Sequence, residues 1–105
     1  MDKTTALKIV REFRSALEER GIRVVTMVLF GSYAAGIQSE GSDIDVIVVS
    51  NDFKGLNHWQ RIERMSDALY KIFQPIEARA LTSEEWESNK SLTVNYVKSG
   101  VSIII

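Results

Sequence analysis

The chain has 105 residues, 45% hydrophobic and 26% charged, which predicts one folded globular domain spanning residues 1–105 rather than a disordered protein. Thirteen basic and fourteen acidic residues leave a net charge of −1, without the basic excess typical of proteins that bind nucleic acid directly. The absence of cysteine excludes disulfide bonds and cysteine-ligated zinc. Since the sequence has no signal-peptide pattern and no apolar run of membrane-spanning length, we expect a cytoplasmic protein without membrane contact.

The first half of the chain predicts one helix and two strands. Apolar residues recur at helical spacing until Gly21, which suits a left-handed helix end. Residues 23–30 are rich in β-branched and apolar side chains, as in a strand covered on both faces. We expect, in order, a helix from a cap at Thr4 or Thr5 to Arg20, a strand over 23–30, a helical turn over 32–35, a polar loop over 36–41 and a strand over 43–50.

The second half alternates helix and strand again. Asn57 can cap a helix over 58–73, and Pro75 stops it and starts an extended segment over 76–81. Ser83 can cap further helix, in one or two pieces, to about Ser99. Gly100 then precedes a last short strand over 101–105. This alternation predicts the α/β or α+β class, built around one sheet.

Two aspartates open the second strand. Asp43 and Asp45 are two residues apart, so their carboxylates emerge on one face of the strand, about 6–7 Å apart at the backbone. Carboxylates this close repel one another, and a divalent cation between them removes the repulsion. Such hard oxygen ligands suit Mg²⁺ or Mn²⁺. A pair of solvated acids at a strand end is the alternative interpretation.

A glycine and a serine follow the first strand directly. Gly31 permits close backbone approach to a phosphate, and the hydroxyl of Ser32 can add a hydrogen bond. Either motif alone is weak evidence, since many turns contain Gly-Ser. Together they join a phosphate cradle to a metal site, which is the equipment for phosphoryl or nucleotidyl transfer.

The segments GSYAAG (31–36) and SDIDV (42–46) resemble, in sequence and spacing, the motif of the minimal nucleotidyltransferases of the DNA polymerase β-like superfamily. The resemblance extends over essentially the whole chain. It implies a single-domain fold with a mixed β-sheet flanked by helices, two Mg²⁺ ions, and transfer of NMP from a nucleoside triphosphate, typically AMP from ATP. It also implies a small helical partner of the HEPN type, in which case the chain is the antitoxin of a toxin–antitoxin pair.

The same resemblance assigns roles to residues. Asp43 and Asp45 would hold the metals and act in catalysis, while Gly31, Ser32 and Ser42 would bind the nucleotide. A third carboxylate is expected on a later strand, to help hold the catalytic metal and to deprotonate the acceptor hydroxyl. Glu77 is the candidate, since alternation over 76–81 can turn it toward the aspartates. As an alternative, Glu77 is a surface acid paired with Arg79.

The chain departs from the family pattern at two positions. Ala35 stands where the family commonly has Arg, which removes a cation near the triphosphate. A charged hydrogen bond of that kind is worth about 1.5–3 kcal/mol. Glu77 stands where the third acid is more often Asp. Both departures weaken the expectation of catalysis more than the expectation of the fold.

The other polar and aromatic residues say less about function. We expect His58 to lie at the surface near a helix start, and Lys54, Arg61 and Arg64 to lie either on a solvated face or near a ligand. For Trp59 and Trp86, packing in the core or at an interface is favoured over stacking on a base.

Three functions remain in competition. The first is an active nucleotidyltransferase that modifies a hydroxyl of a protein partner. The second is a binding module of the same fold that blocks its partner by occlusion alone. The third is transfer to a small molecule such as an aminoglycoside, which would need more chain or a homo-oligomer to form the acceptor pocket.

Overall fold

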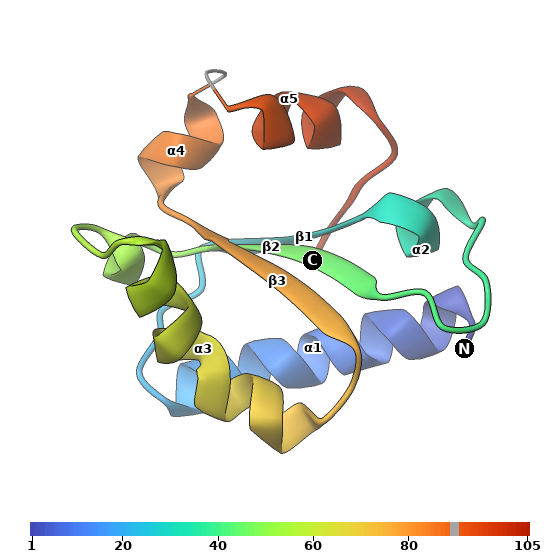
Figure 1. The fold of residues 1–105 in the computed structure, drawn as a ribbon, viewed down its shortest axis with the longest axis horizontal. Helices are drawn as coiled ribbons and strands as arrows, with labels where there is room; N and C mark the ends of the chain where they lie inside the picture. Colours follow the sequence, from blue (N-terminus) through green and yellow to red (C-terminus); the bar gives the residue numbers. More distant parts are fainter. Residues whose placement is uncertain (89–90) are drawn as a thin grey trace.

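The protein is described by a computed structural model that covers residues 1–88 and 91–105. Four strands form one sheet in the order β3-β2-β1-β4, in which β2 and β3 run parallel and β1 is antiparallel to both of its neighbours. The expected α+β fold with a mixed, helix-flanked sheet is therefore confirmed (Figure 1). The elements are α1 (Lys3–Glu19), β1 (Thr26–Phe30), α2 (Gly31–Ala35), β2 (Ile44–Val49), a 3-10 helix η1 (Asn51–Phe53), α3 (His58–Ile72), β3 (Ile76–Leu81), α4 (Ser83–Glu87), α5 (Leu92–Ser99) and β4 (Ile103–Ile104).

Two of the expected helix caps were wrong by one to three residues. The N-cap of α1 is Asp2, whose carboxylate accepts a hydrogen bond from the Thr5 amide at 2.8 Å. The N-cap of α4 is Thr82, which forms a capping box with Glu85. In both cases a residue just upstream has the extended backbone that a cap requires, so the helix starts earlier. The Asn57 cap of α3 is confirmed, again as a capping box.

The strand β3 has the expected bounds, whereas β1, β2 and β4 are shorter than the segments that predict them. The first begins at Thr26 rather than Arg23, whose amide donates instead to the carboxylate of Asp52 at 2.7 Å. The last contains only Ile103 and Ile104, which pair with the middle of β1. Apolar composition marks where a strand can be buried, whereas its ends depend on where a neighbouring strand is available.

One face of the sheet is covered by α1 and α3, which lie below it in Figure 1. Residues from both helices and from alternate strand positions form a continuous core with almost no solvent exposure. Its largest fully buried side chains include Phe13, Leu17, Met27, Leu29 and Met65. This face contains most of the buried apolar side chains, and so most of the hydrophobic stabilisation.

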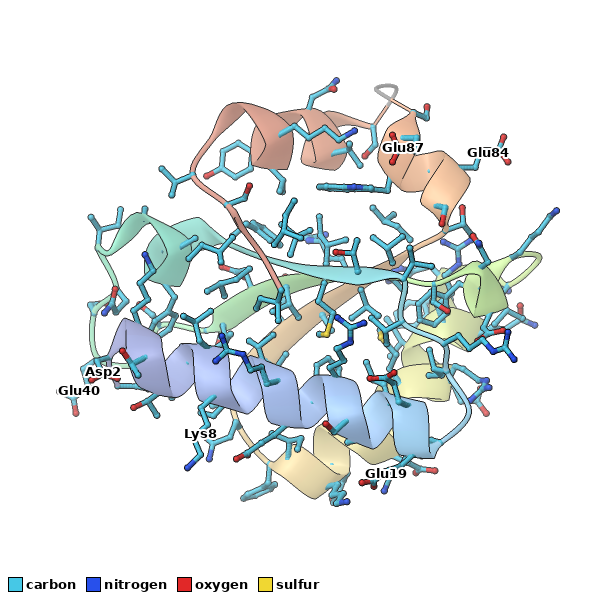
Figure 2. All side chains as sticks on the ribbon, turned by 180° about the vertical axis from the view of Figure 1, so that it is seen from behind. Asp2, Lys8, Glu19, Glu40, Glu84 and Glu87 are labelled. Carbon is cyan, nitrogen blue, oxygen red and sulfur yellow. The ribbon has the colours of Figure 1, made fainter. Side chains whose placement is uncertain are left out.

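The opposite face has a smaller core beneath α4 and α5. Val28, Phe30, Ile47, Val49 and Val97 are buried there, and Leu81 and Trp86 pack against them. The expectation that Trp86 packs in a core is confirmed. Two acidic side chains of α4, Glu84 and Glu87, are exposed, and Figure 2 shows both at the outer surface.

Within residues 1–88 and 91–105, no helix combines the length and the apolar character needed to cross a bilayer.

Candidate nucleotidyl-transfer site

The acidic residues meet on the less covered face of the sheet. Asp45 occupies the second position of β2, on the same face as Ile47 and Val49, as strand alternation predicts. It lies opposite Phe30 of β1 on one side and opposite Glu77 of β3 on the other. Asp43 precedes the strand and is exposed. Register alone therefore brings Glu77 next to Asp45, although 32 residues separate them in sequence.

The Gly-Ser turn contacts this acidic group directly. Gly31 has a φ of +73°, and a Cβ added there would lie only 2.3 Å from Oδ2 of Asp45. Any other residue at this position would be strained in its backbone and would collide with the carboxylate. Gly31 is required by the approach of Asp45 as well as by the turn, so the two halves of the motif form one structural unit.

The surroundings of Asp45 disfavour the ionised form of its carboxyl group. Burial, the carboxylates of Glu77 and Asp43 and a hydrogen bond with Glu77 raise the pKa of Asp45, and Arg79 offsets part of this rise. Three carboxylates that repel one another form a donor set of the kind that holds hard divalent cations. By its chemistry, this set fits Mg²⁺.

The side chains do not converge on a single point, however. Among the described residues, no group of three His, Cys, Asp or Glu is close enough to hold a metal ion. The carboxylate of Glu77 forms an ion pair with Arg79 at 3.3 Å, and both side chains are about half exposed. Glu77 thus has the position expected of the third acid together with the pairing of a surface acid.

The remaining residues assigned to the nucleotide lie on the loop around the turn. Ser32 follows Gly31 and is partly exposed beside the cavity described below. Ser42 is engaged locally, since its hydroxyl accepts a hydrogen bond from the Ser39 amide at 2.9 Å. It shapes the loop before Asp43. Ala35 is exposed at the end of α2, so this position presents no cation.

A cavity of about 240 Å³ opens beside Gly31 and Ser32, between α2 and the C-terminal segment. Apolar side chains that no sequence motif marked form its wall. They are Phe30, Ile37, Tyr96, Val97 and Val101. Of these, Ile37, Tyr96 and Val101 are strongly exposed, at 76%, 67% and 60%. An isoleucine inside the polar loop 36–41 was the one sequence signal that could have pointed to this wall.

The basic and aromatic residues of α3 divide into two groups. Arg61 is largely buried and pairs with Glu85 at 2.6 Å, while Arg64 donates to the carbonyl oxygen of Arg20 at 3.2 Å, so both have structural partners. His58 is exposed at the helix start, as expected. Trp59 is 74% exposed, so of the two expected kinds of packing the core is excluded and the interface stays a prediction. Lys54 is exposed on the turn that follows η1.

Comparison with known proteins places these features in a family. The model of the nucleotidyltransferase domain family matches residues 10–99. A candidate protein adenylyltransferase of Methanocaldococcus jannaschii is 46% identical over 46 residues, which are 42% of this chain and 45% of that protein. The chain therefore matches less than half the length of this relative.

Two solved structures share the fold. A candidate nucleotidyltransferase from Sulfolobus solfataricus superposes with a TM-score of 0.73 at 20% identity, over 97% of this chain and 80% of the other. A second candidate nucleotidyltransferase superposes with a TM-score of 0.63 at 24% identity, over 91% of this chain and 96% of the other. With the sequence motif, the sheet order and the family match in agreement, the chain belongs to the nucleotidyltransferase domain family.

Proposed function

We propose that the chain is a Mg²⁺-dependent nucleotidyltransferase that moves AMP from ATP to a hydroxyl group of a protein. The observation that carries this proposal is the contact between the Gly31 turn and Asp45, with Glu77 on the next strand. That contact supports a single site shared by the residues assigned to the phosphates and those assigned to the metal. Membership of the nucleotidyltransferase domain family supports the same chemistry.

Each residue contributes a separate function to the transfer. Asp43, Asp45 and Glu77 would hold Mg²⁺, two ions by the family resemblance. When bound, the metal supplies positive charge that offsets the charge developing on the phosphate oxygens. Gly31 leaves its backbone open to the β- and γ-phosphates, and Ser32 donates its hydroxyl to them. The apolar wall of Ile37, Tyr96 and Val101 is placed to cover the nucleoside.

The reaction exchanges one bond to the α-phosphorus for another. The acceptor oxygen forms a bond to the α-phosphorus while the bond to the bridging oxygen breaks, and pyrophosphate leaves on the opposite side. Glu77 accepts the proton of the acceptor hydroxyl, which its exposed position permits once it has left Arg79. Ala35 presents no cation to the leaving group, so we expect slower turnover than in relatives that carry Arg there.

A protein acceptor agrees best with the size of the site. The cavity beside Ser32 holds about 240 Å³, below the roughly 300–1,000 Å³ usual for small-molecule sites, so this cavity is too small to enclose a second substrate beside the nucleotide. The related protein from M. jannaschii is named for transfer of adenylyl groups to protein. By the resemblance to minimal nucleotidyltransferases, the partner would be a helical HEPN-type toxin, with this chain as its antitoxin.

Transfer of radiolabel from ATP tests the proposal. The chain is incubated with Mg²⁺, a co-expressed candidate partner and ATP labelled either at the α- or at the γ-phosphate. We expect label on the partner from α-labelled ATP only, and loss of this signal in Asp43→Asn and after chelation of the metal. Equal transfer by Asp43→Asn, or label arriving from the γ-phosphate, would refute the proposed reaction.

Occlusion of the partner without catalysis is the second candidate. It is favoured by the ion pair between Glu77 and Arg79 and by the lack of convergence among the described carboxylates. The two functions separate in a neutralisation assay with the Asp43→Asn/Asp45→Asn variant. A variant that binds the partner and still silences it supports occlusion, whereas binding without silencing supports catalysis.

A further inference from the structure

Three exposed aromatic side chains lie on α3 and at its C-cap. Trp59, Tyr70 and Phe73 are 74%, 80% and 82% exposed. At 100° per residue Trp59, Ser66 and Tyr70 fall within about 40° of one another around the helix. Phe73 is the C-cap that follows its last turn. We call these four residues the aromatic stripe. Exposed aromatic groups at this density mark contact surfaces rather than ordinary solvent-facing helix.

The aromatic stripe is turned away from the rest of the molecule. The contacts of α3 with α1 come from other positions, such as Lys71 to Glu19 at 2.8 Å and Arg64 to the carbonyl of Arg20. Ile62, next to the stripe on the helix, faces the outer side of β3, where it lines a cavity of about 150 Å³ with residues 78–81. The helix that carries the stripe therefore lies against β3, and Figure 1 shows the two elements next to each other.

Phe73 provides a separate indication that the aromatic stripe is used. It ends α3 with a φ of 51°, in the left-handed region that glycine normally occupies. A bulky residue in this conformation costs on the order of 1 kcal/mol or more, and here it also exposes its ring to water. The conformation closes the helix, since the Phe73 amide donates to the Leu69 carbonyl at 3.0 Å, but the ring gains no burial in the single chain. A contact that buries the ring would compensate for both.

Strand β3 offers an edge for pairing beside α3. It lies at the end of the sheet and pairs with β2. The hydrogen bonds from Ile44 to Pro75 and from Ser50 to Leu81 show that odd-numbered residues of this segment turn their backbone groups toward β2. The N–H and C=O groups of residues 76, 78 and 80 therefore point outward. Two of these groups already have partners within the chain: the Ile76 amide donates to the Gln74 carbonyl at 2.7 Å, and the Ala80 carbonyl accepts from Arg61 at 3.2 Å.

We propose that two copies of the chain associate through this surface, with their β3 strands antiparallel and their aromatic stripes in contact. The charges on β3 select this partner and its register. When Ala78 faces Ala78 of the second copy, Glu77 lies opposite Arg79 of that copy, twice in the symmetric pair. Slipping the strands by one pairing step in either direction would place Glu77 against Glu77 or Arg79 against Arg79.

The symmetric strand pair has a two-fold axis that passes between the two Ala78 residues, perpendicular to the sheet. This axis places α3 of both copies on the same face of the joined sheet, antiparallel and side by side. The midpoint of β3 is near Ala78 and the midpoint of α3 is near Ser66, so the small Ser66 side chains face each other across the axis. Trp59 of each copy then meets Tyr70 and Phe73 of the other.

The area available is sufficient for a specific dimer. At about 150–250 Å² per aromatic side chain, the three exposed rings offer roughly 450 Å² per copy, or about 900 Å² for the pair. Strand pairing adds the backbone of residues 76–80. The total reaches the roughly 1,000 Å² or more that specific interfaces bury. Pairing also covers an exposed strand edge, which proteins seldom leave open.

Measuring the mass of the full chain by sedimentation tests the association. We expect a species of twice the 11.9 kDa chain mass, and at least about tenfold weaker association in Trp59→Ser/Phe73→Ser. Ile104→Ser, at the other edge of the sheet and 72% exposed, is the matched control and should associate like the unmodified chain. A monomer at all concentrations would overturn the proposal and leave this surface to a different partner.

Register is tested by exchanging charges. Arg79→Glu places like charges opposite each other twice, and should weaken association about tenfold. Glu77→Arg/Arg79→Glu restores opposite charges and should recover it, with circular dichroism confirming that each variant is folded. A dimer indifferent to both changes is formed by another surface and contradicts the proposal.

A single cysteine gives an independent check, because the chain has none of its own. Ser66→Cys should form a disulfide-linked dimer under mild oxidation, since the two thiols lie at the axis. Ser15 on α1 is exposed like Ser66 but lies outside the proposed contact, so Ser15→Cys should not form a disulfide-linked dimer. Equal cross-linking of the two variants would indicate random collision and would refute the helix contact.

Discussion

The two faces of the sheet divide stability from function. The face under α1 and α3 is closed by a continuous apolar core, whereas the face under α4 and α5 is apolar only over part of its area. On that second face the apolar side chains give way to Asp45 and Glu77 at the end near Gly31. Carboxylates held together destabilise a fold, so they require a scaffold whose stability comes from elsewhere.

The largest expected effect tests this division from the stable side. Phe13 is fully buried between α1 and the sheet, and Phe13→Ala should lower the free energy of unfolding by about 3–5 kcal/mol. Val97→Ala, in the smaller core, removes two methyl groups and should cost only about 1.5 kcal/mol. Urea denaturation measures both. A larger cost for Val97→Ala would reverse the roles assigned to the two faces.

A pair of glycine substitutions tests the contact at the site. Gly31 and Gly36 have nearly equal φ values of +73° and +74°, so alanine imposes a similar backbone cost of about 1 kcal/mol at each. Only at Gly31 does the new Cβ meet a carboxylate; at Gly36 nothing lies within 4 Å. We expect Gly31→Ala to cost about 1–3 kcal/mol more than Gly36→Ala in thermal unfolding. If the two variants are equally stable, Asp45 does not press against the turn.

Arg61 links the two faces at the edge of β3. It donates to the carbonyls of Leu56 and Ala80 and pairs with Glu85 of α4. The single ammonium group of lysine cannot replace the forked guanidinium in all three contacts. Arg61→Lys should therefore lower the free energy of unfolding by about 1–2 kcal/mol at neutral pH. Although burial acts to raise it, the hydrogen bonds from Arg61 and Thr82 lower the pKa of Glu85. The stabilising ion pair is therefore lost as the pH falls through the pKa of folded Glu85. The difference in free energy of unfolding between Arg61→Lys and the unmodified chain, measured by urea denaturation, should shrink in acid.

The smallest expected effect is a gain in stability. Because the pKa of Asp45 is raised in the folded chain, ionised Asp45 destabilises the fold at neutral pH, and this cost disappears once it is protonated in both states, below about pH 3.9. Without metal, Asp45→Asn should therefore raise the free energy of unfolding at pH 7, by less than about 1 kcal/mol since the site is partly open to water. The gain should vanish in acid. A loss at pH 7 would assign Asp45 a structural role.

Asp43→Asn provides the matched variant for this measurement. Asp43 lies outside the strand and is exposed, so its loss should leave the metal-free chain equally or slightly more stable. A clear drop in melting temperature would contradict the view that the aspartates are retained for a ligand.

Local patterns in the sequence predicted most of the fold. Alternation along 43–50 correctly placed Asp45 with Ile47 and Val49, and the Asn57 capping box fixed the start of α3. Helical spacing did not show that Trp59 and Phe73 are exposed. The apolar residues of 58–73 cover a wider part of the helix surface than the part that is buried against the core, and spacing alone does not tell the two apart.

Features of the site that depend on distant segments were not predictable. The contact of Gly31 with Asp45 follows from the pairing of Phe30 with Asp45, which is a property of strand register. The cavity wall formed by Tyr96 and Val101 requires the last strand to return to β1. Family resemblance proposed Glu77, and only the parallel pairing of β3 with β2 places it beside Asp45.

Binding of Mg²⁺ with a non-hydrolysable ATP analogue tests the central claim, that one site holds both phosphates and metal, without knowledge of the acceptor. Thermal unfolding is followed for the unmodified chain and for Asp43→Asn/Asp45→Asn. A ligand that binds only the folded chain stabilises it by about 2.7 kcal/mol at one hundred times its dissociation constant. We predict that Mg²⁺ and the analogue together raise the melting temperature of the unmodified chain, that neither does so alone to the same extent, and that the double variant does not respond. An equal rise in both proteins would contradict the account.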